Sequence, residues 1–379
     1  MKAAVWARRL PWSILAAAVP LVLVGWMALA RCEELADANG HFLRQQIVWS
    51  ALGLAAMLVV SLPSYRLLCR WSYELFLASL ALLVLVYFFP PINHAHRWIR
   101  VGPVGLQPAE FAKVAFVLAL ARYLMYRENY RRLPGLLLPL AISTAPVLLV
   151  LKEPDLGMAL LFLPVLLVML FVAGARRRDL ALLALVGLLL MPLLWTQMSD
   201  DQKSRVTAVF HQVSADQRPA KEAYQLYQAK RMAALGGPWG SLAAGQATDD
   251  LAVYNLPEAR TDFILCVIEE RLGLPGLLAV LGLYGLLAWR GLAIAAATRE
   301  PFGRLVATGI TAMILMQAVI NMGMNVGLLP ITGLPLPMVS YGGSALLAHA
   351  MGLGLLLNVG LRPGYEVTNE PFRWLAAKS

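Results

Sequence analysis

Residues 156–173 read LGMALLFLPVLLVMLFVA and contain no charged side chain. A helix of this length rises about 27 Å, close to the roughly 30 Å of hydrocarbon that a membrane span has to cross. Three arginines follow at Arg176, Arg177 and Arg178, which is typical of a span that ends at the cytoplasmic surface. The stretch therefore predicts a transmembrane helix.

Similar apolar runs continue on both sides of this stretch. The chain has 379 residues, of which 59% are apolar and only 14% charged, with a mean hydropathy of +0.66. A soluble globular chain carries about a quarter charged residues, so a large soluble core does not explain this composition. Ten spans are predicted, at residues 12–30, 46–62, 74–90, 108–125, 134–151, 156–173, 180–198, 264–289, 305–328 and 343–361. We expect an all-α, polytopic integral membrane protein in which residues 1–379 form one membrane domain.

The basic residues orient these spans. Most Lys and Arg fall in the predicted cytoplasmic pieces, whereas the short external loops hold only Arg31, Arg44, Arg97, Arg100 and Lys152. The positive-inside rule then places both termini in the cytoplasm. Residues 12–30 exceed the apolar region of a signal peptide, so we read them as a retained first span of an inner-membrane protein.

Net charge and cysteines exclude other classes of protein. The net charge of +10 does not indicate a nucleic-acid partner, because no basic, aromatic-interleaved segment is present. Cys32, Cys69 and Cys266 lie far apart and form no CxxC pair, so the sequence predicts neither a disulfide framework nor a metal site.

One external connection, residues 199–263, is far longer than the others. It spans about 65 residues of mixed charge, and connections of more than about 15 residues are usually functional or disordered. It contains amphipathic stretches, Trp239, several Tyr residues and a Gly236-Gly237-Pro238 cluster. We therefore expect this long loop to be partly ordered.

Ionisable residues mark three places near the predicted outer face. Glu110 and Lys113 share a helix face at spacing i,i+3, Glu153 and Asp155 flank Pro154, and Asp262 precedes the eighth span. A charge in hydrocarbon costs several kcal/mol unless it is paired or hydrated, so each place is a functional candidate. We expect all three to converge on one outward-facing cavity.

Each of these places also has a purely structural interpretation. Glu110 and Lys113 form a self-neutralising pair that anchors the bundle in one interpretation, and a substrate site in the other. Asp155 and Asp262 each precede an apolar run, so either carboxylate is also a candidate helix cap.

The last external loop is uncharged and rich in glycine and proline. It reads GLPLP at residues 333–337 and SYGGS at residues 340–344. Irregular backbone at membrane depth is tolerated where it lines a cavity or packs on protein. Its N–H and hydroxyl groups would bind an anionic or sugar ligand, through the residues Ser340, Tyr341, Gly342 and Gly343.

Five strings in this order resemble one family, the shape, elongation, division and sporulation (SEDS) proteins, which include RodA, FtsW and SpoVE. They are RWI at 97–99 with QPAEFAK at 107–113, EPDLG at 153–157, LPE at 256–258 with TDFI at 261–264, GLPLP at 333–337, and SYGGS at 340–344. NVGLLPITG at 325–333 looks closer to RodA than to FtsW. The chain departs from the family pattern at Glu153, at Asp249-Asp250 and at Arg260.

The resemblance implies a peptidoglycan glycosyltransferase that polymerises lipid II, the undecaprenyl-pyrophosphate-linked disaccharide-peptide, for cell elongation and shape. It implies that Asp262 is the essential carboxylate. It also implies a class B penicillin-binding protein, a transpeptidase, as partner. The alternatives are a lipid II flippase and a non-catalytic scaffold for a transpeptidase. Charges gathered at the outside, rather than along the depth of the membrane, favour the enzyme.

Glycosyl transfer to a hydroxyl needs a base and stabilisation of the departing pyrophosphate. We expect Asp262 to be the base, while Lys113, Arg97 and Arg205 offset charge on the pyrophosphate and Glu110 holds Lys113. A divalent cation such as Mg²⁺ or Mn²⁺ would assist, although the sequence displays no dedicated set of metal ligands.

Overall fold

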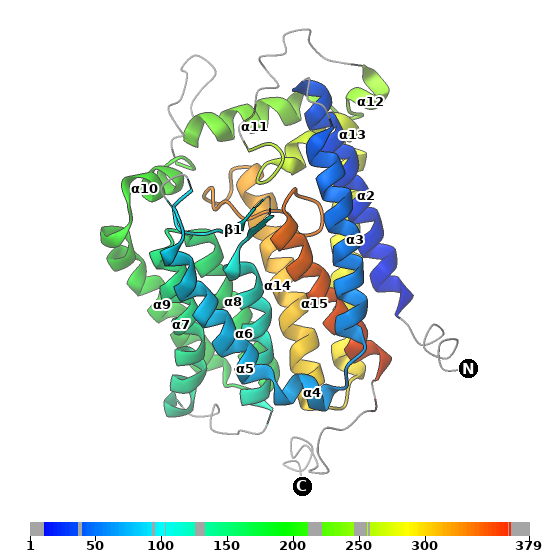
Figure 1. Ribbon diagram of the computed structural model, residues 1–379. Helices are drawn as coiled ribbons and strands as arrows, with labels where there is room; N and C mark the ends of the chain where they lie inside the picture. Colours follow the sequence, from blue (N-terminus) through cyan, green and yellow to red (C-terminus); the bar gives the residue numbers. More distant parts are fainter. Residues whose placement is uncertain are drawn as a thin grey trace, which may run out of the picture.

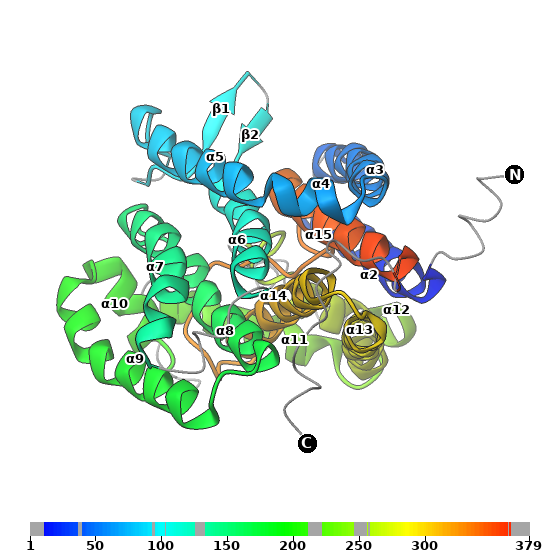
Figure 2. The ribbon, with the colours of Figure 1, turned by 90° about the horizontal axis from the view of Figure 1, so that it is seen from below.

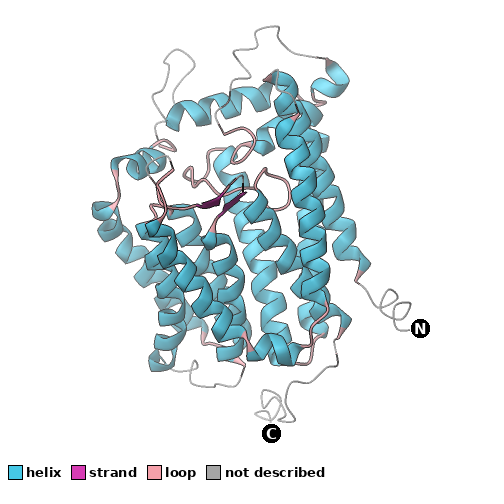
Figure 3. Ribbon diagram, viewed as in Figure 1, coloured by secondary structure: helices cyan, strands magenta, loops and turns pink. Residues whose placement is uncertain are grey.

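The computed structural model describes residues 11–36, 40–92, 95–102, 104–125, 133–210, 222–245, 256, 258–362 and 364. Long helices run side by side as one bundle, as the ribbons show (Figures 1 and 3). The sequence predicts that both termini lie in the cytoplasm, but the terminal residues lie outside the described ranges. Asp249 and Asp250 lie outside them too.

Within the described ranges, seven helices are long and apolar enough to cross a membrane. They are α2 (Trp12–Leu35), α3 (His41–Ser61), α7 (Leu137–Lys152, continuing the 3-10 turn η3, Leu133–Leu136), α8 (Leu156–Ala173), α13 (Ile264–Ala297), α14 (Pro301–Asn325) and α15 (Gly343–Leu361). Further apolar helices lie where spans are predicted: α5 (Ser72–Leu85) with the 3-10 turn η1 (Val86–Phe88), α6 (Pro108–Leu124) and α9 (Arg177–Gln197). The helical multi-pass membrane fold is confirmed, and the count of ten spans stays a prediction.

Helices α2 and α13 continue at their C-terminal ends well beyond their predicted apolar runs. Helix α2 continues past Ala30 to Leu35, because Arg31 in the extension is neutralised by Glu270 of α13. Helix α13 continues to Ala297, with a break at Gly273, which has φ 63° and ψ −153°. Hydropathy alone marks where the hydrocarbon ends, whereas a paired charge allows the helix to continue.

Helix α14 forms the centre of the bundle. Viewed along the bundle, α14 has α6, α8, α13 and α15 around it (Figure 2), and it packs against all four. Helix α9 packs mainly on α8 and leaves leucines such as Leu188 and Leu189 exposed, as expected of a lipid-facing helix.

The end of the bundle at the top of Figure 1, here called the loop end, carries most of the irregular structure. The long loop is partly ordered there, as expected, into α10 (Asp200–Thr207), α11 (Glu222–Gly236) and α12 (Ser241–Ala244). Helix α11 lies across the loop end, and both α11 and α12 pack on α13. The Leu274 N–H donates to the Pro238 carbonyl at 3.1 Å, which joins this loop to the break in α13.

The sequence did not predict two small elements. An antiparallel hairpin joins β1 (Ile99–Val101) and β2 (Val104–Leu106), with Ile99 opposite Leu106, directly before α6. A short helix, α4 (Tyr65–Arg70), turns the chain between α3 and α5. Both are too short to produce a hydropathy period, so the prediction of an all-α fold holds apart from this one hairpin.

Candidate active site at the loop end

The turn that carries Asp262 is held by α14. Asn321 Nδ2 and Asn325 Nδ2 donate to the backbone oxygen of Asp262 at 2.8 and 3.0 Å. Asn321 Nδ2 also donates to the carbonyl of Leu334 at 2.8 Å. Helix α13 starts from Phe263 with no side-chain capping bond, so the Asp262 carboxylate is not its helix cap. The backbone of Asp262 is therefore fixed while its carboxylate is not used for capping.

Gly333 lies close to both the Asp262 carboxylate and Arg205 of α10. Gly333 has φ 71°, and a Cβ at this residue would lie 3.6 Å from Asp262 Oδ2 and 3.6 Å from Arg205 Nη1. A side chain here would be strained and would fill the space between the two charges. The ordered start of the long loop thus brings a cation near the carboxylate. The expected role of Arg205 toward the pyrophosphate stays a prediction.

The environment of Asp262 tunes its proton affinity. Burial, followed by the nearby Glu258 carboxylate, raises the pKa of Asp262 to about 7, while Arg205 acts in the opposite direction. A general base works best when its pKa lies near the working pH. At neutral pH a large fraction of Asp262 is therefore ionised and able to accept a proton.

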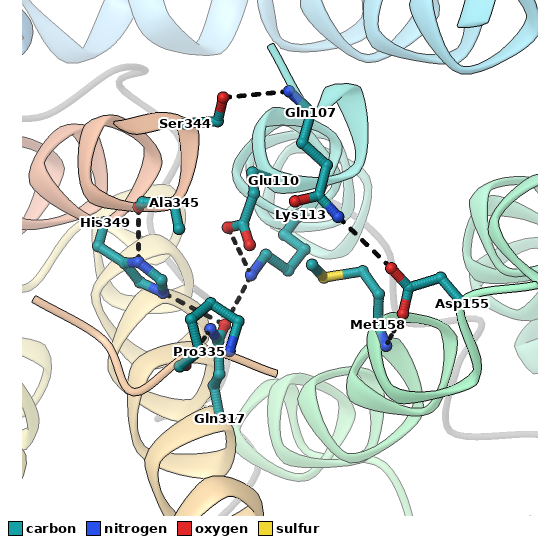
Figure 4. A network of polar contacts seen from close by, with 10 residues as sticks. All are labelled: Gln107, Glu110, Lys113, Asp155, Met158, Gln317, Pro335, Ser344, Ala345 and His349. Carbon is teal, nitrogen blue, oxygen red and sulfur yellow. Dashed lines mark hydrogen bonds and ion pairs between the residues drawn. The ribbon is translucent and has the colours of Figure 1, made fainter. Parts of the chain in front are cut away.

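Glu110 and Lys113 form the buried pair that their spacing predicts. Lys113 Nζ lies 2.9 Å from Glu110 Oε2, and both side chains are buried in α6 (Figure 4). Lys113 Nζ also donates to Gln317 Oε1 of α14 at 2.6 Å. Within the described residues, neither carboxylate oxygen of Glu110 receives a well-oriented hydrogen bond, so the contact with Lys113 is chiefly an ion pair.

Gln317 connects this pair to the last loop. Its Nε2 donates to the Pro335 carbonyl at 2.8 Å, and its Oε1 lies 3.2 Å from Nε2 of His349 on α15. Pro335 is two residues from Gly333, which faces Asp262. Lys113 and Asp262 are thus tied to neighbouring positions of one short loop.

The Glu153-Pro154-Asp155 turn lies beside the same site. Asp155 caps α8 by accepting from the Met158 N–H at 3.2 Å, so the capping interpretation is confirmed for this residue. Asp155 also lies close enough to Asp262 to raise its pKa. The turn therefore adds negative charge near the proposed base.

Arg97 uses its guanidinium to hold this turn. Nε donates to the Glu153 carbonyl at 3.0 Å, Nη2 donates to the Pro154 carbonyl, and Nη1 lies 3.8 Å from Asp155 Oδ2. Burial, reinforced by Asp155, raises the pKa of Glu153 to about 8, so its carboxyl is mostly protonated at pH 7.

The SYGGS string packs against the Asp262 turn and against α3. The Ser340 hydroxyl donates to the Thr261 carbonyl and accepts from the Leu336 N–H, and the Tyr341 N–H donates to the Arg260 carbonyl at 2.9 Å. These contacts place the string beside the predicted base.

Gln46 of α3 holds the same string from its other side. Its Nε2 donates to the Ser340 carbonyl at 3.0 Å, and its Oε1 accepts from the Gly342 N–H at 3.3 Å. Gly343 lies against Trp49, where a Cβ would approach the indole to 2.3 Å. The Ser340 hydroxyl and the N–H groups of Tyr341 and Gly342, which the sequence analysis expected to bind a ligand, are thus engaged within the protein in this structure.

Sequence reasoning missed four amide side chains that organise the site. Gln317, Asn321 and Asn325 recur every four residues on α14, and Gln46 lies on α3. A spacing of four places side chains on one helix face, so this polar stripe in an apolar helix was a readable signal. Gln46 stands alone and offered no such pattern.

The convergence of the three charged places on one outward-facing cavity stays a prediction. A small pocket borders Lys113, and its other lining is apolar, from Phe116, Val117, Leu161, Phe162, Val165 and Met313. Asp262 is not part of this lining. Among the described residues no group of three His, Cys, Asp or Glu side chains could hold a metal ion.

Comparison with known proteins gives consistent results. A family model for cell cycle proteins, FtsW/RodA/SpoVE, matches residues 8–362. The chain is 35% identical over 343 residues to "Probable peptidoglycan glycosyltransferase FtsW" of Trichlorobacter lovleyi, covering 88% of each chain. It is 34% identical over 347 residues to peptidoglycan glycosyltransferase MrdB of Escherichia coli K12, a RodA protein, covering 90% of this chain and 92% of MrdB. These two values do not distinguish a RodA-type from an FtsW-type protein.

A solved structure agrees at the level of the fold. It comes from work described as "Structural coordination of polymerization and crosslinking by a peptidoglycan synthase complex". It superposes with a TM-score of 0.80 at 32% identity, covering 94% of this chain and 98% of that one.

Proposed function

The chain belongs to the FtsW/RodA/SpoVE family and is a peptidoglycan glycosyltransferase, and we propose that it polymerises lipid II at the outer face of the inner membrane. The loop end then faces outward, and both termini lie in the cytoplasm. The product is a glycan strand for cell elongation. The observation that carries the proposal is Asp262, a carboxylate with a pKa of about 7 on a turn fixed by two amides of α14.

In the proposed reaction Asp262 removes the proton from the 4-hydroxyl of the acceptor GlcNAc. The oxygen then attacks the anomeric carbon of the lipid-linked strand, and the bond from that carbon to the pyrophosphate oxygen breaks. Attack from the face opposite the leaving group inverts the configuration at the anomeric carbon. An alcohol is a weak nucleophile at neutral pH, so a base that accepts its proton during attack lowers the barrier.

The departing pyrophosphate requires positive charge. Lys113 and Arg205 are the candidates, because each lies beside the loop that contains Gly333 and Pro335. Preorganised cations aimed at developing negative charge stabilise the transition state. Glu110 holds Lys113. Arg97 is engaged with the 153–155 turn, so we assign it to positioning Asp155 beside the site.

The partner in this proposal is a class B penicillin-binding protein that crosslinks the strands. The support is the similarity to a protein of a peptidoglycan synthase complex that is described as coordinating polymerization and crosslinking. The lipid tails of the substrate would lie among the membrane-spanning helices, next to apolar surface such as that exposed by α9.

The experiment is reconstitution of purified protein with labelled lipid II, with and without the transpeptidase, followed by gel analysis of glycan strands. We expect strands from the wild type and none from Asp262→Asn, which keeps the size of the side chain but removes the base. A folded Asp262→Asn variant with full polymerisation would exclude the proposed role.

A flippase assay on the same vesicles separates the enzyme from a transporter. Lipid II placed only on the outer leaflet suffices for an outward-facing enzyme, so polymerisation should not depend on transfer between leaflets. Movement of lipid II across the bilayer without strand formation would favour the transporter instead.

A further inference from the structure

Gln317 is a fully buried amide in an apolar helix, and its chemistry determines its orientation. Its nitrogen lies 2.8 Å from the Pro335 carbonyl, which can only accept a hydrogen bond. The amide oxygen must therefore face the opposite way, toward Lys113 Nζ at 2.6 Å. One side chain thus links the ammonium of α6 to the loop that reaches Asp262 (Figure 4).

Lys113 is held by two acceptors of different kinds. Glu110 is a carboxylate that holds the ammonium and cancels its charge, whereas Gln317 holds it without cancelling any charge. An ammonium has three N–H donors, and within the described residues Gln317 Oε1 accepts one of them, while the Glu110 carboxylate makes an ion pair without a well-oriented hydrogen bond. The remaining donor capacity suits an anionic oxygen.

His349 of α15 packs against the amide. Its Nδ1 lies 2.6 Å from the Ala345 carbonyl, so this nitrogen must carry the proton. Its Nε2 lies 3.2 Å from Gln317 Oε1, and because both atoms are acceptors when the ring is neutral, this is a packing contact and not a hydrogen bond. Helices α6, α14 and α15 and the last loop therefore meet at Gln317.

We propose that Gln317 is a positioning residue that aims the Lys113 ammonium at the pyrophosphate and keeps it in register with the loop beside Asp262. The inference rests on the proposed role of Lys113 in binding pyrophosphate. Gln317 touches neither substrate nor reacting atoms and acts through Lys113.

The test combines turnover with binding that needs no turnover. Gln317→Met keeps the length of the side chain and removes both of its hydrogen bonds. A hydrogen bond to a charged group contributes enough for about a tenfold effect, so we expect kcat/KM for lipid II to fall about tenfold, mainly through KM. The affinity for undecaprenyl pyrophosphate in detergent should fall by the same factor.

A double-mutant cycle separates positioning from general stability. In a Lys113→Met background, Gln317→Met should cause no further loss of affinity, because its effect passes through the absent ammonium. If Lys113→Met alone does not fold, the Lys113→Met/Glu110→Gln pair provides the background, because the remaining side chain is then neutral. Independent, additive losses in the cycle would overturn the proposal.

Asn358 provides the matched control. It is also a fully buried amide, and its Nδ2 donates to the Val60 and Pro63 carbonyls at 3.0 and 2.8 Å, far from the site. Asn358→Leu should lower thermal stability as Gln317→Met does, yet leave KM and pyrophosphate affinity unchanged. A similar rise in KM in both variants would reduce Gln317 to a structural role.

The two readouts also separate this inference from the proposed function. Wild-type protein that binds undecaprenyl pyrophosphate in a Gln317-dependent manner without forming strands would refute polymerisation and support the positioning role. If the wild type forms strands and Gln317→Met forms them equally well, polymerisation is supported and the positioning role of Gln317 is refuted.

Discussion

Two buried ion pairs at the loop end differ in how completely they are satisfied. Arg31 of α2 and Glu270 of α13 form a bidentate pair, with Nε to Oε2 at 3.0 Å and Nη2 to Oε1 at 2.8 Å. Lys113 and Glu110 make one contact at 2.9 Å within a single helix. All four side chains are at most 5% exposed, so burial does not separate the two pairs.

The difference lies in what each pair leaves available. The Arg31–Glu270 pair uses both carboxylate oxygens and joins two helices, which suits a structural clamp. In the Lys113–Glu110 pair, the carboxylate oxygens of Glu110 accept no well-oriented hydrogen bond. The ammonium of Lys113 donates instead to the neutral amide of Gln317. A buried charge that is incompletely satisfied is a stronger functional candidate than one that is fully paired.

The largest effect is expected when each pair is neutralised as a whole. Lys113→Met/Glu110→Gln should lower polymerisation by about 10²–10³-fold, the range seen when one group that stabilises transition-state charge is removed. Arg31→Met/Glu270→Gln should keep polymerisation close to wild type. Gel analysis of glycan strands from labelled lipid II measures both, and equal losses in the two double variants would erase the distinction.

Removing only one partner of the clamp should mainly affect stability. Arg31→Met leaves Glu270 buried opposite an apolar side chain, which costs about 3–5 kcal/mol. Thermal unfolding in detergent, followed by tryptophan fluorescence, should show a marked fall in Tm. Adding Glu270→Gln should restore much of it, and an unchanged Tm in the single variant would contradict the clamp.

The pH dependence of polymerisation should follow Asp262. Because the base must be deprotonated and its pKa is about 7, the rate should rise about tenfold between pH 6 and pH 8 and then level off. Arg205 lowers this pKa, so Arg205→Gln should move the rise to higher pH. Glu258 raises it, so Glu258→Gln should move the rise to lower pH. A rate independent of pH in this window would argue against Asp262 as the base.

The smallest effect is expected at Glu153, whose pKa is raised to about 8. Between about pH 4.5 and pH 8 the folded chain holds a proton there that the unfolded chain has lost, so stability falls as pH rises through this window. Glu153→Gln removes that dependence and should raise Tm by a few degrees at pH 8. The Tm difference between Glu153→Gln and wild type should vanish near pH 4. A Tm difference that persists at pH 4 would show that the raised pKa of the buried Glu153 carboxyl is not its cause.

Much of the site was readable from residue types and spacing. The i,i+3 spacing of Glu110 and Lys113 predicted their ion pair, and the apolar run after Pro154 predicted Asp155 as a cap. The same argument for Asp262 was wrong, since α13 begins without a side-chain cap. Capping preference is local, whereas Asp262 is held by Asn321 and Asn325 from a helix about 60 residues later.

Sequence alone determined the class of this protein, because hydropathy over about twenty residues is a local property that selects a membrane-spanning helix. It also indicated the family through five ordered strings between residues 97 and 344. Only the tertiary structure decided which charges meet. Arg31 is 239 residues from Glu270 and Lys113 is 204 from Gln317, and no local pattern encodes contacts of that separation. Those contacts arise from helices packing around α14, and they distinguish the clamp from the ammonium held by Glu110 and Gln317.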